Sequence, residues 1–434
     1  MRNLFAISAV IYVTIYALEG VVRYGLYSVG QDGAILLRDA LIIGPLALLF
    51  AAQAFRGHAH PAFTVFTGIV FIHGIIAVMN LHTMLPAIYG AKLLVNILFG
   101  FFAGRELVQP GRKLLTIFVL LWLVTVTGIV LDKFVFAFPW IGLETHIGGI
   151  KVDVSRGWDI EDTFDKRAAG FSRSSISAAM LLPVLAMVIA PRINSFLLRG
   201  SMLALTLGGV LLTTQKGSVV ALAAVSGILC LPKWSRYSLL CAAGIGFALL
   251  AVALPPLTNG LMMPESAGVF SFASFAMRIS LTWPDAWRWI SNNDVFPFGV
   301  GLGGIGGAQR FYAANFFNPS DNLFVYVYAN FGLLSLVYLA WIAALGPRLP
   351  REMRANCIAA LAVLAFLLGY GAALSVLEDQ VAALFLGAAA GMLWHSRQFA
   401  LGRNWGDPWL GRTSFLSSRI PAWAFMPGEA SRAR

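Results

Sequence analysis

Basic side chains in three separate connections of the chain could together bind a multiply charged anion. Arg167, Lys216 and Arg278 each lie between apolar stretches, and Arg288 follows Arg278 in the same connection. A guanidinium group binds phosphate oxygens through two parallel hydrogen bonds, and a lysine ammonium adds a further positive charge. If these side chains meet at one site, they would stabilise the charge that develops on a departing phosphate or diphosphate, without a metal ion.

One carboxylate follows the connection that contains Arg278. Asp321 lies in the run NPSDN at 318–322, directly before an apolar stretch. A carboxylate close to an acceptor hydroxyl could orient that hydroxyl or remove its proton. The same position is also typical of a helix N-cap, so the alternative is that Asp321 or Asn322 caps the helix that follows.

The longest connection contains a predicted amphipathic helix at 271–293. Arg278, Trp283 and Trp287 fall close to one stripe of this helix, and Arg288 lies beside them. The tryptophan rings could stack on sugar rings or prenyl carbons. Anchoring at a membrane interface is the commoner role of tryptophan and is the alternative interpretation.

A glycine-rich run, PFGVGLGGIGG, follows at 297–307. Glycine lets a backbone approach a ligand closely and present its N–H groups to an anion. A flexible hinge is the alternative. Because no strand precedes the run, we do not expect a dinucleotide-binding loop. The candidate ligand-binding positions are Gly299, Gly301 and Gly303.

The composition of the chain predicts that lipid is its main solvent. Of 434 residues, 59% are hydrophobic and 12% are charged, and the mean hydropathy is +0.77. Soluble domains carry about 25% charged residues. This excludes a soluble globular enzyme, a disordered chain and a disulfide scaffold. The three cysteines show no disulfide or zinc pattern, and we expect them to be free thiols.

Twelve apolar stretches are long enough to cross about 30 Å of hydrocarbon as helices. We therefore expect an all-α polytopic membrane protein with about twelve transmembrane helices. The predicted order is helices 1–5 in residues 1–132, an outer loop at 133–172, helices 6–9 in 173–254, a large outer loop with short helices at 255–320, helices 10–12 in 321–395, and a basic cytoplasmic tail at 396–434.

The distribution of charge between the connections predicts the orientation. With both termini in the cytoplasm, the inner segments hold 18 of the 31 Lys and Arg residues and 4 of the 20 Asp and Glu residues. All of the net charge of +11 then lies on the cytoplasmic side, as the positive-inside rule requires. The basic excess is thus an orientation signal, and we expect no nucleic-acid partner.

The motifs of the second half resemble those of the O-antigen polymerase and ligase superfamily of bacterial envelope glycosyltransferases. The pattern of that family is an Arg, a Trp a few residues later, Pro-x-x-Gly-x-Gly-x-Gly, a short polar motif ending in Asn, and Gly-Leu. The runs RAAGF at 167–171 and QKG at 215–217 resemble two further family marks, Arg-x-x-Gly-Phe and Ser-Arg-Gly. The main pattern is matched here by Arg278, Trp283, 297–303, Asp321, Asn322, Gly332 and Leu333.

The resemblance implies a multi-pass glycosyltransferase of the inner membrane whose active site faces the periplasm and which needs no cofactor. It would transfer a glycan from undecaprenyl diphosphate to another lipid-linked repeat, and a membrane protein that regulates chain length would be a further partner. Arg278 and Asp321 would be catalytic. The predicted substrate-binding residues are Arg167, Lys216, Trp283, Arg288, Gly299, Gly301, Gly303 and Asn322.

Two alternatives remain at this point. Ligases that join O-antigen to lipid A-core typically carry a His where Asp321 stands, and none of the six histidines of this chain lies between 147 and 394. The sequence therefore favours a polymerase over a ligase. The second alternative is a flippase or transporter of lipid-linked oligosaccharide without catalysis, which would have little use for a large outer loop.

Overall fold

The computed structural model is a bundle of helices with one short β-hairpin, and it describes all residues except 58–59, 148–149, 156–166, 262–271 and 401–434. The strands β1 (Glu144–Ile147) and β2 (Ile150–Asp153) pair in antiparallel fashion. The helices of the first half are α1 (Arg2–Ala17), α2 (Glu19–Ser28), α3 (Ala40–Phe55), α4 (Pro61–Leu81), α5 (Leu85–Val108), α6 (Arg112–Phe134), α7 (Ser175–Ile189), α8 (Phe196–Leu212) and α9 (Lys216–Cys230).

The second half begins with α10 (Lys233–Leu257) and contains a run of shorter helices before two long buried ones. A π-helical turn, η3 (Arg278–Thr282), joins α11 to α12 without a break. The predicted helix at 271–293 is therefore confirmed from residue 273 onward. The remaining helices are α11 (Ala273–Met277), α12 (Trp283–Asn293), α13 (Leu323–Phe331), α14 (Leu334–Ala343), α15 (Arg351–Arg354), α16 (Ile358–Gly371) and α17 (Gln380–Ala400).

Within the described residues, seven helical segments are long and apolar enough to cross a membrane by length and composition. Counting α1 and α2, which are bent by 77°, as one span would make eight. The predicted all-helical architecture is thus confirmed, whereas the count of twelve spans and the orientation stay predictions. The seven segments are Asp32–Phe55, Pro61–Leu81, Leu85–Val108, Arg112–Phe134, Ser175–Arg192, Lys233–Leu257 and Arg351–Gly371.

The predicted tenth helix, 321–345, is not one continuous helix. It is divided at Gly332, whose φ of 56° and ψ of −138° end α13 before α14 begins. A Cβ atom at this position would lie 2.2 Å from the carbonyl oxygen of Pro297, so only glycine fits. The break exists because the glycine-rich run packs there, with Leu333 N–H donating to Pro297 at 2.9 Å.

Helices α5 and α17 are in direct backbone contact along a seam of glycines. A Cβ atom on Gly100 would lie 1.9 Å from the carbonyl oxygen of Leu384, and one on Gly387 would lie 2.0 Å from that of Ile97. Small residues spaced by four, such as Gly100 with Gly104 on α5, allow close helix approach where no hydrophobic effect drives association. The seam joins an early helix to the last described one.

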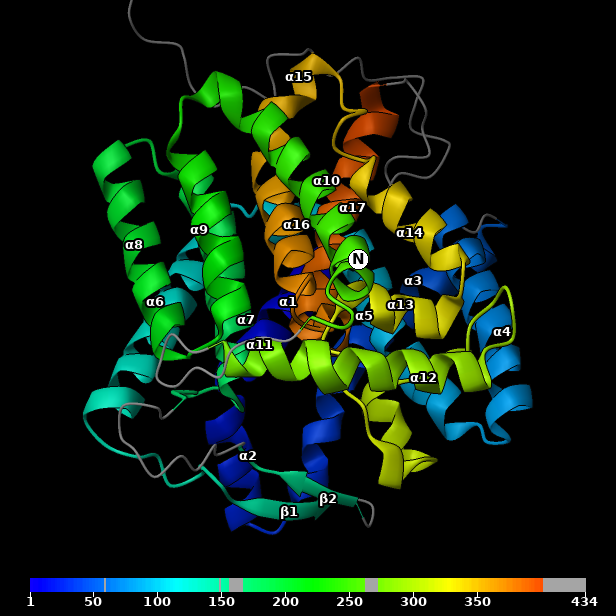
Figure 1. Cartoon of the computed structure of the whole chain (residues 1–434). Coiled ribbons are helices and arrows are strands. Elements are labelled where there is room, and N and C mark those ends of the chain that lie inside the picture. The colour runs from blue at the N-terminus through cyan, green and yellow to red at the C-terminus, as the bar shows by residue number, and fades with distance from the viewer. Residues whose placement is uncertain (58–59, 148–149, 156–166, 262–271, 401–434) are drawn as a thin grey trace, which may run out of the picture.

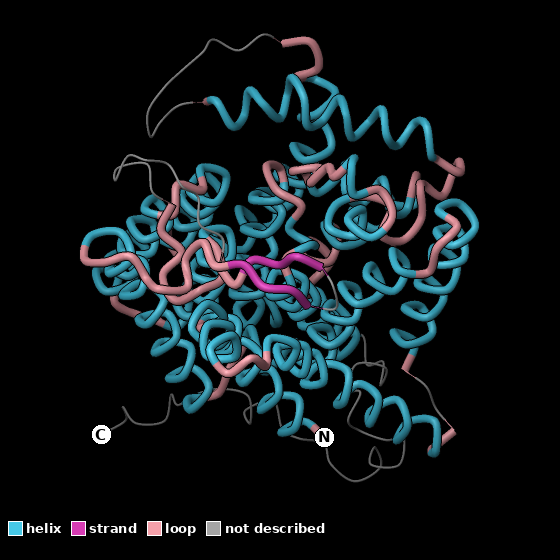
Figure 2. Tube along the Cα trace, turned by 90° about the horizontal axis from the view of Figure 1, so that it is seen from below, coloured by secondary structure: helices cyan, strands magenta, loops and turns pink. Residues whose placement is uncertain are grey.

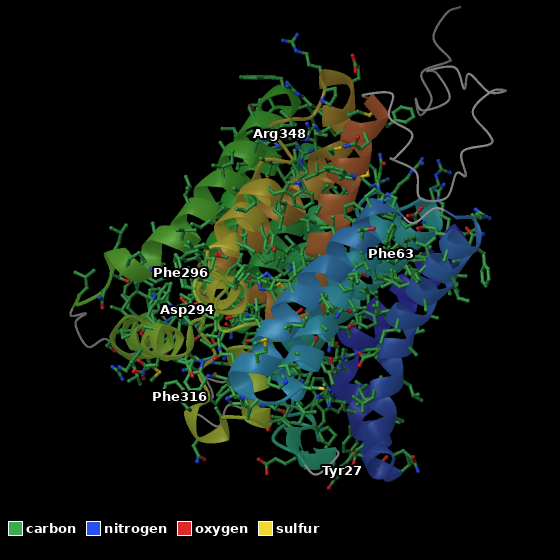
Figure 3. All side chains as sticks on the ribbon, turned by 90° about the vertical axis from the view of Figure 1, so that its right-hand side faces the viewer. Tyr27, Phe63, Asp294, Phe296, Phe316 and Arg348 are labelled. Carbon is green, nitrogen blue, oxygen red and sulfur yellow. The ribbon has the colours of Figure 1, made fainter. Side chains whose placement is uncertain are left out.

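The helix bundle has two distinct ends. Tyr27, at the end of α2, and Arg348, before α15, lie at opposite ends of the molecule (Figure 3). The β-hairpin lies at the same end of the molecule as α2. Helices α11 and α12 run across the bundle, roughly perpendicular to the long helices (Figure 1). Seen from that end, the hairpin lies in front of the bundle and the α11–α12 run follows one edge (Figure 2).

Buried ion pairs stabilise the bend between α1 and α2. Glu19 accepts hydrogen bonds from Arg23 at 2.7 Å and from Arg38 at 2.9 Å, and all three side chains are buried. Lys92 of α5 pairs with Asp39 at 2.6 Å. Buried charges are tolerated when they are paired in this way. These pairs connect α2 and α5 with the segment that precedes α3.

Candidate functional site

Arg278 and Asp321 form an ion pair between the two segments that the sequence marked as catalytic. The Nε atom of Arg278 lies 3.1 Å from Oδ2 of Asp321, and about a fifth of each side chain is exposed, 19% and 23%. Arg278 is the first residue of the π turn, a distortion that is frequent at functional sites. A partly exposed pair of this kind is accessible to a ligand from outside the protein.

The backbone holds Asp321 in an unfavourable conformation. Ser320 and Asp321 have φ values of 57° and 42°, in the left-handed region that non-glycine residues rarely adopt. The hydroxyl of Ser320 is hydrogen-bonded to the hydroxyl of Ser375 at 2.5 Å. The backbone N–H of Ser320 donates to Oδ1 of Asn318 at 2.7 Å. These contacts offset the strain and direct the carboxylate of Asp321 toward Arg278.

Asn322, not Asp321, is the N-cap of α13. Its Oδ1 accepts hydrogen bonds from the N–H groups of Phe324 and Val325 at 2.8 and 3.1 Å. Its Nδ2 donates to the carbonyl groups of Ala251 and Ala372, both at 3.1 Å. The fold thus uses the whole amide of this fully buried residue, and its predicted contact with substrate stays a prediction.

A buried carboxylate that no sequence motif indicates holds the backbone just after Arg167. Oδ2 of Asp132, at the end of α6, accepts hydrogen bonds from the N–H groups of Ala169 and Gly170 at 2.7 and 3.0 Å. Burial and the neighbouring Arg278 guanidinium lower the pKa of Arg167 below its usual value. The two arginines therefore lie within electrostatic range of each other, although 111 residues separate them.

Tyr370, near the end of α16, is the residue around which the predicted site residues gather. It interacts electrostatically with Arg278, Arg167 and Asp321. Its hydroxyl donates to Oε1 of Gln215 at 3.3 Å, and Gln215 directly precedes Lys216. No motif in the sequence indicated Tyr370, because a tyrosine in an apolar helix normally belongs to the core.

Lys216 lies at the edge of this cluster, at the first position of α9. Gly217, the residue after Lys216, packs against the end of α16. A Cβ atom on Gly217 would lie 2.8 Å from the Cβ atom of Ala373 and 3.4 Å from the ring of Tyr370. The structure thus brings the segments of Arg167, Lys216 and Arg278 to one place. We call Arg167, Lys216, Arg278, Asp321 and Tyr370 the cationic cluster.

The three predicted glycines lie in a loop that is packed between helices. Their φ values are 81°, 101° and 79° for Gly299, Gly301 and Gly303. A Cβ atom on Gly301 would lie 2.4 Å from the amide nitrogen of Ala77 in α4, and one on Gly303 would lie 2.1 Å from the Pro86 carbonyl oxygen. Packing therefore explains why glycine is needed at these positions, and a contact with substrate stays a prediction.

Trp283 and Arg288, both on α12, make contacts with other residues than those of the cationic cluster. Trp283 is 1% exposed and its ring packs edge-on against Phe275, so it offers no face for a sugar ring in this conformation. Arg288 pairs with Asp285 one turn earlier on α12, at 3.0 Å, and its side chain is 67% exposed. Their predicted contacts with substrate thus have no support in this geometry.

The described residues contain no group of three or more His, Cys, Asp or Glu side chains that could hold a metal ion. No family model matches the chain, and no curated protein matches it either. The fold and the composition define the chain as an apolar, mostly helical protein with seven or eight helices suited to cross a membrane. At one end of the bundle it carries the cationic cluster.

Proposed function

We propose that this chain is a membrane glycosyltransferase that polymerises lipid-linked repeat units. It transfers a glycan from undecaprenyl diphosphate to another lipid-linked repeat on the periplasmic side of the inner membrane. The observation that carries the proposal is the cationic cluster. Arg167 and Arg278, from distant connections, both act electrostatically on Tyr370, and Gln215, next to Lys216, is hydrogen-bonded to the same tyrosine. The carboxylate of Asp321 is paired with Arg278.

The cationic cluster suits a diphosphate leaving group. Arg167 and Arg278 repel each other in the free protein, and this repulsion contributes to the lowered pKa of Arg167. A ligand with several negative charges between them would remove the repulsion and gain two charge-assisted contacts. As the glycosidic bond breaks, negative charge grows on the diphosphate, and fixed cations stabilise this charge more strongly in the transition state than before it.

The ion pair of Arg278 and Asp321 links donor binding to activation of the acceptor. In the free protein the carboxylate is held by the guanidinium at 3.1 Å. A diphosphate that binds Arg278 competes for this contact and releases the carboxylate. The released carboxylate can then accept a hydrogen bond from an acceptor hydroxyl and take its proton.

The proposal is tested with purified protein in proteoliposomes that contain an undecaprenyl-diphosphate-linked oligosaccharide. We expect glycans of several repeat lengths, and we expect Arg278→Ala to leave only single repeats. The control is Arg351→Ala, an exposed arginine in the first turn of α15 at the other end of the bundle. Full-length polymer from Arg278→Ala would remove this residue from the mechanism.

Two further outcomes identify the alternative functions. Transfer of a single glycan to added lipid A-core, with no elongation of the lipid-linked repeat, would show a ligase. Movement of the lipid-linked oligosaccharide across the bilayer without any change in its length would show a transporter. Either result contradicts the polymerase.

A further inference from the structure

A second cationic site lies at the other end of α6. A hollow of about 370 Å³ opens where α1 begins, α5 ends and α6 begins. Its lining includes four basic residues, Arg2, Arg105, Arg112 and Lys113, and one acid, Glu106. The part of α6 between Arg112 and Asp132 is about 30 Å long at 1.5 Å per residue, and it separates this hollow from the end of the molecule that carries the cationic cluster. We call it the α6 hollow.

The charge of the α6 hollow is unbalanced. Glu106 is nearly buried and is already paired with Arg2, whose Nε lies 2.5 Å from its Oε1. With four basic side chains and one acid, the lining carries a formal net charge of +3. The side chains of Arg112 and Lys113 are exposed. Positive charges held close together repel one another, and an anion in the hollow would remove that repulsion.

The start of α6 also favours an anion. Gly111 occupies the N-cap position and has no side chain to accept a hydrogen bond from the first amides of the helix. The N-terminus of a helix carries a partial positive charge and points its free N–H groups outward. Together with Arg112 and Lys113, it forms a binding site for phosphate oxygens.

The helices that border the α6 hollow carry exposed apolar side chains. On α1, the side chains of Ile7 and Ile11 are 58% and 42% exposed, and on α6 that of Leu120 is 55% exposed. These residues lie on helices beside the hollow, and α6 is long and apolar enough to cross a membrane. A ligand with a phosphate head and apolar chains therefore fits this place better than a free anion does.

We propose that the α6 hollow binds the phosphate headgroup of an anionic phospholipid, with the acyl chains along α1 and α6. Basic pockets between membrane helices are known to take such headgroups. The usual role of basic residues at helix ends is to set orientation, which requires only that they lie on one side of the membrane. Convergence of four of them on one hollow goes beyond that requirement.

The test measures lipid binding by the full-length protein in detergent, with phosphatidylglycerol, phosphatidylcholine and inorganic phosphate as separate ligands. We expect native mass spectrometry to show retained phosphatidylglycerol and little phosphatidylcholine. The double variant Arg112→Gln/Lys113→Gln should weaken binding of phosphatidylglycerol at least tenfold. The matched control is Lys233→Gln/Arg351→Gln, which removes two exposed cations from the first turns of α10 and α15 and should bind as the unaltered protein does.

Three results would overturn the proposal. They are equal binding of both phospholipids, equal loss of binding in the control variant, and displacement of phosphatidylglycerol by millimolar inorganic phosphate, which would identify a free-phosphate site. The thermal unfolding of the double variant without lipid shows whether it folds. If it does not, the single variant Lys113→Gln is measured with the same expectation of weakened binding. Because the assay uses no glycan, its outcome is independent of the proposed polymerase.

Discussion

Asp321, the proposed catalytic carboxylate, lies at a strained point of the backbone. Two consecutive left-handed residues cost about 1–3 kcal/mol each, and such strain persists where surrounding contacts over-determine it. Asp285 lies on the same side of the molecule but pairs with Arg288 within α12. Asp285 therefore serves as the control for a substitution of Asp321.

We expect Asp321→Asn to lower the rate of glycan elongation by about 10²–10⁴-fold, the usual contribution of a general base. The amide keeps the size of the side chain and loses the ability to accept a proton. Asp285→Asn should change the rate little. Initial rates with a lipid-linked repeat at saturating donor measure both variants. Equal rates for Asp321→Asn and the unaltered protein would assign Asp321 to structure only.

A second prediction uses the lowered pKa of Arg167. Arginine stays charged at every ordinary pH, even here, whereas a lysine has an ordinary pKa near 10.4. Burial and the Arg278 guanidinium should also lower the pKa of a lysine at this position. The rate of Arg167→Lys relative to the unaltered protein should therefore fall as the pH rises through that lowered pKa.

The measurement is the ratio of the two initial rates between about pH 6.5 and 9.5, a range that ends below the ordinary lysine pKa. The ratio cancels every titration that the two proteins share. A constant ratio would mean that the charge at position 167 does not contribute to the reaction.

At the scale of the elements, the glycine-rich loop shows what a sequence can and cannot reveal. The run at 297–307 was recognisable, and the structure explains its glycines through close contact with α4, α5 and the break at Gly332. That break was not predicted, because the hydropathy of 321–345 is continuous across it. The partner that requires the break lies some 35 residues earlier in the chain.

The packing role of these glycines predicts a clear difference in stability. In Gly301→Ala, a Cβ atom would meet the backbone of Ala77 at 2.4 Å and the φ of 101° would be strained, so we expect a loss of at least about 2 kcal/mol. Gly246→Ala, in α10, has no atom within 4 Å of the added group. It should be neutral or slightly stabilising, since alanine favours a helix.

Thermal unfolding in detergent checks this pair, with tryptophan fluorescence as the readout. Similar unfolding temperatures for the two variants would mean that the loop moves away from α4 at little cost. Such a result would favour the alternative interpretation of the glycine-rich run, a flexible hinge.

The same scale explains which parts of the candidate site could be predicted. Arg167, Arg278 and Asp321 were found from charged residue types in apolar surroundings. Tyr370 and Asp132 were missed, because their roles depend on contacts between segments that are far apart in the chain. The periodicity of apolar residues identifies the buried face of a helix. It does not identify which distant loop contacts the end of that helix, as the loop at 169–170 contacts Asp132.

For the whole molecule, composition alone predicted a helical protein suited to a bilayer, and the structure confirms the helices. The number of spans was harder to predict, since α8, α9 and α14 are apolar but shorter than a membrane requires. A count from hydropathy treats each apolar stretch as a crossing. Hydropathy likewise does not register the buried ion pairs of Glu19, the first residue of α2 after the bend.

The predicted orientation gives a direct test. In a variant without the free thiols Cys230, Cys241 and Cys357, a cysteine in place of exposed Ser28 should react with a membrane-impermeant maleimide in spheroplasts. A cysteine in place of exposed Lys233 should react only after permeabilisation. The opposite pattern would invert the topology and place the cationic cluster in the cytoplasm.

The glycine seam between α5 and α17 also constrains how a newly made chain matures. About 270 residues are synthesised between the end of α5 and the start of α17. At roughly 5–20 residues per second, about a quarter of a minute to a full minute passes before α17 is available to pack against the glycines of α5. Ser375, which is hydrogen-bonded to Ser320, comes just before α17. The proposed catalytic arrangement is therefore completed late in synthesis, and we expect a nascent chain that lacks this segment to be inactive.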